Sequence, residues 1–391
     1  MNHCTIAYTF YEIDYRVRRY AEALVGPGNR TDVIALRKEN AEKNGKLNGV
    51  NIYRIQKRNF NEKGRFSYFL KILSFFIKGS IILTLKHLRY RYRIIHIHSV
   101  PDFLVFMGLI PKLLGARIIL DIHDILPEFY CQKFDQKNDS FLARSLLFIE
   151  KLSVHFADHV IVANDLWREK IISRDKISSK KCTTMLNYPN LEYFKNNHYK
   201  PNKDVIRIIY PGHLSYHHGL DVGIKALAIV KQEVPSVRLD IYAGSWVLEY
   251  REFLEELINK LDLEDNVYFY DPVNIEELAK IYKKVDIGIV TKRAGIFSSE
   301  AFSTKIFDFM AAGVPTVASK TKIDEYYFDD SMIMFFEPEN HEDLAKRIIE
   351  LYRNPEKRRL LSDSGKEYVA KNNWEEKKQI YLDLVDSLTT Q

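Results

Sequence analysis

Cysteine is scarce in this sequence: its 391 residues include three, Cys4, Cys131 and Cys182. They lie far apart and no C-x-x-C pair occurs, so neither a disulfide framework nor a thiolate zinc site is expected. Sparse cysteine is usual where thiols stay reduced, and we therefore expect a cytoplasmic protein.

Long apolar runs are also missing. The N-terminal charges follow the first apolar residues, which is the reverse of their order in a secretory signal peptide. The longest apolar stretch, Phe69 to Leu85, is interrupted by Lys71 and Lys78. The sequence therefore predicts no membrane-spanning helix.

Two ligand-binding signatures are absent as well. The chain contains no D-x-D, which usually holds the divalent cation of a nucleotide-sugar diphosphate, so we expect no metal site and no cofactor. Neither half has a G-x-G-x-x-G after its first predicted strand, which argues against a hydride-transferring dehydrogenase.

The sequence does contain enough apolar residues for two cores, with 46% hydrophobic and 28% charged residues. Short apolar strands alternate with amphipathic helices in both halves. The predicted strands are 4–10, 31–36, 51–55, 94–100, 116–123 and 158–163, followed by 206–212, 237–244, 266–271, 286–291, 315–319 and 332–336. Uniformly apolar strands separated by helices indicate two doubly wound α/β domains with parallel sheets.

The domain limits follow from a polar stretch, Glu192 to Asp204, between the two halves. The first domain is predicted to span 1–195 and the second 196–372. The last helices have no strand after them, so we expect 373–391 to pack back on the first domain. Open parallel sheets bind ligands beyond the carboxyl ends of their strands, so the loops there are the candidate sites.

The segment Ser298 to Ser319 is the strongest candidate site. Glu300 and Asp308 are eight residues apart and bracket about two turns of a predicted helix, with Lys305 between them. A helix N-terminus beside a lysine favours a phosphate, and a carboxylate further along can accept hydrogen bonds from ribose hydroxyls. The pattern also suits an amphipathic helix with a solvated charged face, but its place after a strand favours a site.

This segment resembles the paired-acid signature of glycosyltransferase family 4, in which two glutamates separated by seven residues precede A-M-A-x-G-x-P-V. Here the pair is Glu300 and Asp308, followed by F-M-A-A-G-V-P, and the second acid is an aspartate. Three other segments resemble the same family: TFYEIDYRVRRYAEAL, the stretch from IIHIHSV to DIHDILPEFY, and IYPGHLSYHHGLDVGIKAL. The resemblance covers nearly the whole chain.

The resemblance implies the GT-B fold, in which two Rossmann-like domains face each other across a cleft. The second domain would bind a nucleotide-diphosphate sugar, the first would bind the acceptor, and transfer would retain the anomeric configuration. Asp308 would hold the ribose, while Glu300 at the sugar and Lys305 at the diphosphate would be catalytic. Backbone amides would join Lys305 at the diphosphate, those of Ala301, Phe302 and Ser303.

One departure from the family concerns the cations that contact the diphosphate. Many members have an Arg after the glycine of the entry strand and a Lys before the next glycine. This chain has His213 after Gly212, and His218 at the second place. Neutral imidazoles stabilise a leaving diphosphate less, which shifts the predicted contact to Lys305 and Arg293. A bound diphosphate could protonate His213 or His218; alternatively, His217 and His218 are turn residues on a surface loop.

A second group of polar residues, Asp121 to Glu128, follows the strand 116–123 directly. His123 could hydrogen-bond a sugar hydroxyl, oriented by Asp124 or Glu128. By resemblance, His123 contacts the transferring sugar and is a catalytic residue, while Asp124 and Glu128 belong to the acceptor site.

His96 and His98 lie on the same face of the strand 94–100. We interpret His96 as structural and His98 as a lining residue of the acceptor site. An H-x-H pair with no third ligand nearby is weak support for a metal.

The stretch from Arg54 to Arg93 is strongly basic, with eleven Lys and Arg residues and one acid, Glu62. Within it, Arg65 to Arg93 has an apolar side with cations along it, as in helices that lie on anionic membranes. The same pattern is typical of a helix that packs on the core and ends in basic residues. R-Y-R-Y-R suits stacking on nucleic acid, but the net charge is only +6 and no nucleic-acid-binding motif occurs, so no such partner is expected.

The predicted function is transfer of a sugar from a nucleotide-diphosphate sugar to a glycan or lipid-linked hydroxyl, without a metal. The alternatives are a nucleotide-sugar epimerase of the same fold, and a non-catalytic glycosyltransferase-like scaffold subunit, which the replaced Arg and Lys would favour. By resemblance, the acceptor is a lipid-linked or surface-polysaccharide intermediate at the cytoplasmic side of a membrane.

Overall fold

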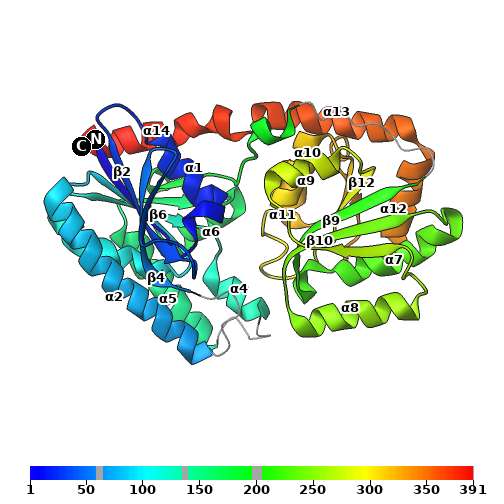
Figure 1. Cartoon of the computed structure of the whole chain (residues 1–391), viewed down its shortest axis with the longest axis horizontal. Coiled ribbons are helices and arrows are strands. Elements are labelled where there is room, and N and C mark those ends of the chain that lie inside the picture. The colour runs from blue at the N-terminus through cyan, green and yellow to red at the C-terminus, as the bar shows by residue number, and fades with distance from the viewer. Residues whose placement is uncertain (59–64, 134–139, 196–204, 391) are drawn as a thin grey trace. The chain divides into compact units, whose positions relative to one another are not determined.

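The computed structural model describes residues 1–58, 65–133, 140–195 and 205–390. The chain divides into two compact units: unit 1 is Met1–Asn187 together with Lys378–Gln391, and unit 2 is Tyr188–Lys377. Each unit is built on one sheet with helices on both of its faces (Figure 1). Of the predicted linker, residues 196–204 lie outside the described residues.

Unit 1 contains an eight-stranded sheet in the order β3-β4-β2-β1-β5-β6-β7-β8. Its strands are β1 (Asn2–Ile6), β2 (Arg30–Arg37), β3 (Asn44–Leu47), β4 (Val50–Lys57), β5 (Ile94–His98), β6 (Arg117–Ile122), β7 (His159–Val162) and β8 (Cys182–Thr184). Strand β3 is antiparallel to β4, and the other pairs are parallel. The apolar pattern predicts neither β3, which is polar and mostly exposed, nor β8, which has three residues.

Polar caps satisfy the first amides of several helices of unit 1, namely α1, α5, α6 and η3. Asp14 caps α1 by accepting a hydrogen bond from the Val17 amide at 3.1 Å, which fixes Arg16 in the first turn. The helices are η1 (Tyr11–Ile13), α1 (Tyr15–Ala23), α2 (Arg65–Tyr90), η2 (Asp102–Gly108), α3 (Leu109–Leu113), α4 (Leu126–Lys133), α5 (Phe141–Phe156), α6 (Asp165–Asp175), η3 (Ser179–Lys181) and, from Lys378 onward, α14 (Trp374–Thr390).

Helix α2 differs from the sequence expectation. Its residues Ser67–Tyr90 are long and apolar enough, by length and composition, to cross a membrane, and 22% of their most apolar stretch is buried. The expectation that no run reaches this length was wrong, because the two interrupting lysines do not end the helix. One side of α2 nevertheless packs into unit 1: Phe75 and Leu83 are fully buried, and a Cβ at Gly79 would lie 2.8 Å from the Met107 sulfur.

Unit 2 contains a six-stranded sheet, all parallel, in the order β11-β10-β9-β12-β13-β14. Its strands are β9 (Arg207–Leu214), β10 (Arg238–Trp246), β11 (Val267–Tyr270), β12 (Ile287–Val290), β13 (Thr316–Ser319) and β14 (Met334–Phe336). Its helices are η4 (Leu191–Phe194), η5 (Tyr216–His218), α7 (Leu220–Glu233), α8 (Leu248–Lys260), α9 (Ile275–Tyr282), α10 (Thr304–Ala312), α11 (Lys322–Tyr327), α12 (His341–Arg353) and α13 (Pro355–Lys371).

Both sheets follow the predicted arrangement. Each of the twelve predicted strands overlaps a strand of the structure, so the prediction of two doubly wound, largely parallel α/β units is confirmed. In unit 2, Gly288 of β12 lets α10 pack closely, because a Cβ there would lie 2.6 Å from the Phe309 ring. This packing places the first turn of α10 near the carboxyl ends of β9 and β12.

Candidate functional site

Lys305 is the centre of the polar group in unit 2. It lies in the first turn of α10 and crosses the end of β9 at Gly212, where a Cβ would be 2.4 Å from the lysine Cε. Only glycine leaves room for this crossing, because a Cβ at residue 212 would collide with the Lys305 side chain. The Lys305 ammonium also lies 5.3 Å from the centre of the Tyr210 ring, within the range of a cation–π contact.

The Lys305 ammonium is held in surroundings that disfavour its charge. Burial, and after it the nearby Lys292 ammonium, lowers the pKa of Lys305 to about 8, and Asp308 opposes this shift. An anion bound here would favour the charged form, so the site is electrostatically suited to a phosphate.

His213 and His218 lie beside this lysine. Their ring centres are 5.8 Å apart, and the His218 Nδ1 is 3.0 Å from the Ser215 hydroxyl. Burial, followed by the charge of Lys305, lowers the pKa of His218 to about 2. The free protein therefore carries a neutral His218 at neutral pH. Protonation of His218 by a bound diphosphate stays a prediction.

Arg293, for which a diphosphate contact is predicted, forms ion pairs with two carboxylates in the structure. Its guanidinium donates to both carboxylate oxygens of Asp221 at 2.7 Å and to Glu339 at 2.6 Å. Its Nε donates to the Tyr216 carbonyl oxygen at 3.0 Å. Arg293 thus holds the η5 turn against the end of β12, and Lys305 remains as the cation next to Gly212.

Glu300 lies in a turn before α10, not on the helix. The expectation that Glu300 and Asp308 share one helix is therefore wrong, because the helix begins at Thr304 with Ser303 as its N-cap residue. Glu300 is 8% exposed and accepts a hydrogen bond from the Lys322 ammonium at 3.0 Å. Asp308 does lie on α10, one turn after Lys305.

The three residues predicted to offer amides to a diphosphate differ in their surroundings. The Ala301 amide donates to the Phe297 carbonyl oxygen at 2.9 Å, so it would have to give up this bond to reach a ligand. The Phe302 ring packs at 4.7 Å from the Phe307 ring, which leaves only its backbone for a phosphate. Ser303 makes no side-chain cap hydrogen bond to α10.

Lys292 is a residue that the sequence reasoning missed. It is buried, pairs with Asp324 at 2.7 Å and donates to the Ala301 carbonyl oxygen at 2.9 Å. It therefore anchors the turn that carries Glu300. The signal in the sequence was a lysine placed directly after the strand 286–291, a position where an unpaired charge would be costly.

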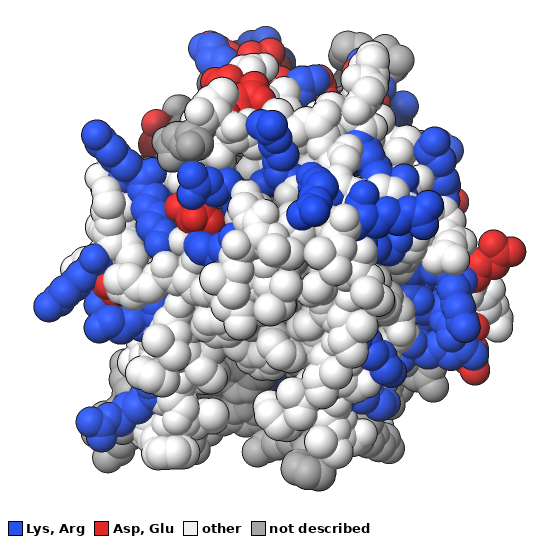
Figure 2. Space-filling model, turned by 90° about the vertical axis from the view of Figure 1, so that its left-hand side faces the viewer, with Lys and Arg blue, Asp and Glu red and all other residues white. Residues whose placement is uncertain are grey.

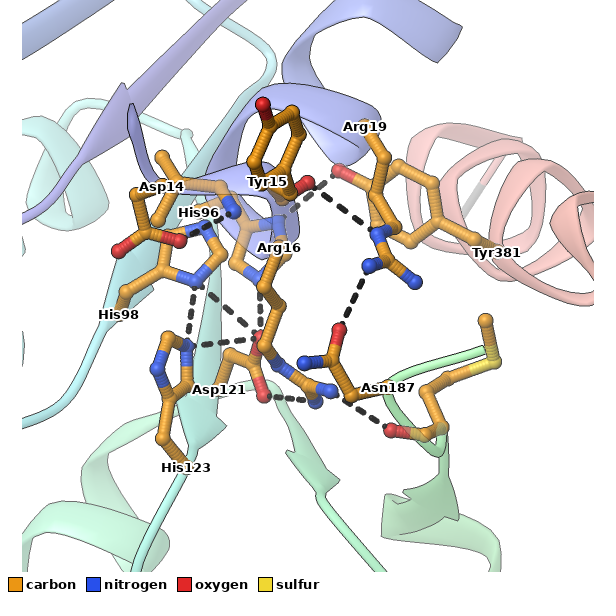
Figure 3. Close-up of polar contacts among 12 residues, drawn as sticks. Asp14, Tyr15, Arg16, Arg19, His96, His98, Asp121, His123, Asn187 and Tyr381 are labelled. Atoms are coloured by element: carbon orange, nitrogen blue, oxygen red, sulfur yellow. Dashed lines mark hydrogen bonds and ion pairs between the residues drawn. The ribbon is translucent and has the colours of Figure 1, made fainter. Parts of the chain in front are cut away.

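The polar group of unit 1 is centred on Asp121, at the end of β6 (Figure 3). This carboxylate is fully buried and accepts two hydrogen bonds from the Arg16 guanidinium, from Nε at 2.9 Å and from Nη2 at 2.7 Å. Arg16 also donates to the Met185 carbonyl oxygen at 2.9 Å. Helix α1 is thereby tied to the carboxyl edge of the sheet.

His98 and His123 meet at the same carboxylate (Figure 3). The His98 Nδ1 lies 3.1 Å and the His123 Nε2 lies 3.3 Å from one Asp121 oxygen, and these two nitrogens are 2.9 Å apart. The His98 side chain is buried, whereas the His123 side chain is 22% exposed. His123 is thus held by a buried carboxylate and keeps an accessible edge for a ligand.

The charges of this group balance internally. Burial alone would raise the pKa of Asp121, but the Arg16 guanidinium and hydrogen bonds from His123 and His98 hold it well below its usual value. Burial lowers the pKa of His98, although Asp121 opposes the shift. The group therefore contains an ionised aspartate and a neutral His98 at neutral pH.

A third potential metal ligand lies near the H-x-H pair, contrary to the sequence expectation. Ligand atoms of His96, His98 and Asp121 lie within 4.8 Å of one another. Both Asp121 oxygens already accept from Arg16, whose positive charge would oppose a cation here. The His96 Nδ1 is 3.0 Å from the Tyr381 hydroxyl of α14, as suits the structural role predicted for His96.

The two acids predicted to orient His123 differ in their surroundings. Burial raises the pKa of Asp124, with His123 and Arg16 opposing the shift. Glu128 is buried and accepts from Arg174 at 2.7 Å, so it is tied to α6. The orienting carboxylate in the structure is Asp121, which the sequence reasoning missed as such, although a charged residue inside an apolar strand was the available signal.

Two family models match the chain: the Glycosyl transferase 4-like domain over residues 13–187 and Glycosyl transferases group 1 over residues 193–368. An uncharacterised glycosyltransferase of Methanocaldococcus jannaschii is 25% identical over 374 residues, which cover 92% of this chain and 87% of the relative.

Two solved structures have the same fold. Sucrose-phosphate synthase of Thermosynechococcus elongatus has a TM-score of 0.76 and 20% identity, covering 99% of this chain and 100% of that chain. Anabaena HepE in complex with UDP has a TM-score of 0.70 and 16% identity, covering 99% and 100%. Since the two family models account for both units, the chain belongs to the family-4 type glycosyltransferases of the GT-B fold.

Proposed function

We propose that this protein is a retaining hexosyltransferase that uses a nucleotide-diphosphate sugar and needs no metal. The observation that carries the proposal is the Lys305 ammonium at the end of β9, packed against Gly212 and with a pKa lowered to about 8. Such a cation is stabilised by a phosphate. The UDP bound in the structure of Anabaena HepE supports a nucleoside diphosphate as the ligand.

Each polar residue of unit 2 has a part in this proposal. Lys305 and the amides at the start of α10 stabilise the charge of the leaving diphosphate. Asp308 accepts hydrogen bonds from the ribose hydroxyls. Glu300, held by Lys322, lies against the donor sugar.

The polar group of unit 1 serves the sugar and the acceptor. His123 hydrogen-bonds a sugar hydroxyl, and Asp121 fixes the orientation of its ring. In the transfer step, the acceptor oxygen forms a bond to the anomeric carbon on the face from which the diphosphate departs. The bond to the diphosphate oxygen breaks with its electron pair, and a phosphate oxygen takes the acceptor proton.

The acceptor in this proposal is a glycan or lipid-linked hydroxyl at the cytoplasmic side of a membrane. Support comes from the resemblance of the sequence to enzymes of surface-glycan synthesis. Transfer to lipid-linked acceptors by the purified protein would support it, and modification of soluble molecules alone would count against it.

The first experiment is a thermal-shift screen of UDP, GDP, ADP and CDP, with and without EDTA. A nucleotide that binds the folded state raises the melting temperature. We expect one nucleotide to do so regardless of EDTA, and Asp308→Ala to lose the shift. If no nucleotide raises the melting temperature of the wild type, the proposed donor site is contradicted. That result would favour the non-catalytic scaffold alternative.

A further inference from the structure

One face of unit 1, formed by α2, α3 and α5 and here called the helical face, exposes many apolar side chains. More than half of the exposed large hydrophobic residues in the described part of the chain lie on these helices or directly after α3. On α2, Ile77, Ile81 and Leu85 are 52%, 56% and 62% exposed and, at a spacing of four, share one side of the helix. Figure 2 shows a broad area without charged side chains, with mostly Lys and Arg above it and at its sides.

The other two helices extend the same surface. Leu113 of α3 is 75% exposed, and Phe141 and Phe148 of α5 are 87% and 62% exposed. Helices α2 and α5 both pack on η2, through ring pairs whose centres are 5.8 Å and 5.1 Å apart. The three helices therefore form one surface, and apolar surfaces of this extent are typical of interaction sites.

The charges around the helical face are mostly positive. The stretch Arg65 to Arg93 contains no Asp or Glu, and neither does α3. The one acid of α5, Glu150, is buried. At the end of α2 and α3 the lining of a pocket of about 590 Å³ includes Arg91, Arg93 and Arg117. Its one acid, Asp158, pairs with Lys112 at 3.0 Å and with Arg117 at 3.5 Å, so the cations outnumber it. A surface that is apolar at its centre and basic at its edge complements an anionic lipid headgroup layer.

The contacts on the buried side of α2 indicate whether this helix would cross a bilayer or lie flat on its surface. Phe75 and Leu83 are fully buried in unit 1, and Gln56 of β4 donates to the Lys71 carbonyl oxygen at 2.8 Å. Crossing the bilayer would require α2 to leave these contacts, whereas lying flat requires no change. We propose that the helical face docks on an anionic phospholipid bilayer, with its apolar side chains at the acyl boundary and its cations at the phosphates.

This proposal is independent of the proposed catalysis and is tested by co-sedimentation of the full chain with vesicles. Phosphatidylcholine vesicles are compared with vesicles that also contain phosphatidylglycerol. We expect binding to the mixed vesicles, weakened by added salt. Leu85→Glu and Leu113→Glu should each lower the vesicle partition coefficient about tenfold, because each removes a leucine that the bilayer would bury.

The matched control is Leu360→Glu on α13 of unit 2, where the leucine is 54% exposed. It should bind vesicles as the wild type does, and thermal unfolding shows whether each variant is folded. The proposal is overturned if the wild type ignores the mixed vesicles or if Leu360→Glu weakens binding equally. It is also overturned if a second copy covers this face, seen as a dimer that Leu85→Glu dissociates.

Discussion

Asp121 in unit 1 and Lys305 in unit 2 both lie at the carboxyl edge of a parallel sheet, yet their surroundings differ. Asp121 accepts two hydrogen bonds from Arg16 and lies within 3.3 Å of ring nitrogens of His98 and His123. Among the described residues, no carboxylate forms an ion pair with Lys305, and its neighbours include the neutral His218 and Tyr210.

This difference in surroundings bears on the roles proposed for the two groups. The charge of Asp121 is compensated within the protein, so its arrangement orients His123 whether or not a ligand is bound. The charge of Lys305 is only partly offset by Asp308, so the folded protein tolerates it at a cost that an anion would remove. We therefore expect substitutions at Asp121 to act first on stability, and those at Lys305 to act first on turnover.

Asp121→Asn has the largest expected effect. The substitution leaves the Arg16 guanidinium buried without its counter-charge, which should cost about 3–5 kcal/mol in the free energy of unfolding. Adding Arg16→Met should restore part of this loss, since the unpaired charge is then gone. Thermal and urea unfolding measure both variants.

Glu22→Gln is the control for this pair, because it weakens a partly exposed ion pair with Arg18, one turn away on α1. It should cost less than about 1 kcal/mol. If Asp121→Asn proves as stable as Glu22→Gln, the buried Arg16–Asp121 pair does not contribute the free energy of unfolding that we assign to it.

Lys305→Met tests the other side of the comparison. It should lower turnover about 10²–10³-fold, the usual effect of removing one donor that stabilises developing negative charge. It should also stabilise the free protein near neutral pH. The pKa of Lys305 is about 8 in the folded protein and 10.5 ordinarily, so folding penalises its charged form below pH 8, and the penalty fades as the pH rises to 10.5.

Lys320→Met is the matched control, because Lys320 is exposed and pairs with Glu325 at 3.4 Å. It should change neither turnover nor the pH profile of unfolding. A Lys305→Met variant with full turnover would contradict the proposed role, and an unchanged biological output would favour the scaffold alternative.

The two sheets could be predicted from the sequence because strands buried on both faces are uniformly apolar, as in the strands 94–100 and 286–291. Lys305 and His123 could be proposed as candidate site residues because His123 ends the strand 116–123 and Lys305 lies in the segment that follows the strand 286–291. The contact of Lys305 with Gly212 depends on the strand order of unit 2 and could not be predicted.

Partners distant in sequence could not be predicted. Arg16 and Asp121 are 105 residues apart, and their contact depends on the strand order that brings α1 beside β6. Arg293 could be placed at a strand end, but its ion pairs with Asp221 and Glu339 depend on how three separate segments meet. The expectation that Glu300 shares a helix with Asp308 was wrong because α10 begins only at Thr304, with Ser303 as its N-cap residue.

The smallest expected effect is the pH dependence of nucleotide binding. If a diphosphate binds at Lys305, it raises the pKa of this lysine from about 8, so binding above pH 8 takes up a proton. Affinity for the nucleotide should then fall as the pH rises through 8, by up to about tenfold per unit. Lys305→Arg keeps its charge throughout this range, so its affinity for the nucleotide should stay level.

Calorimetry in two buffers of different ionisation enthalpy measures the proton uptake at pH 9. Equal heats in both buffers would show that the diphosphate does not contact the Lys305 ammonium. The uncompensated charge that distinguishes Lys305 from Asp121 would then have no role in binding the nucleotide.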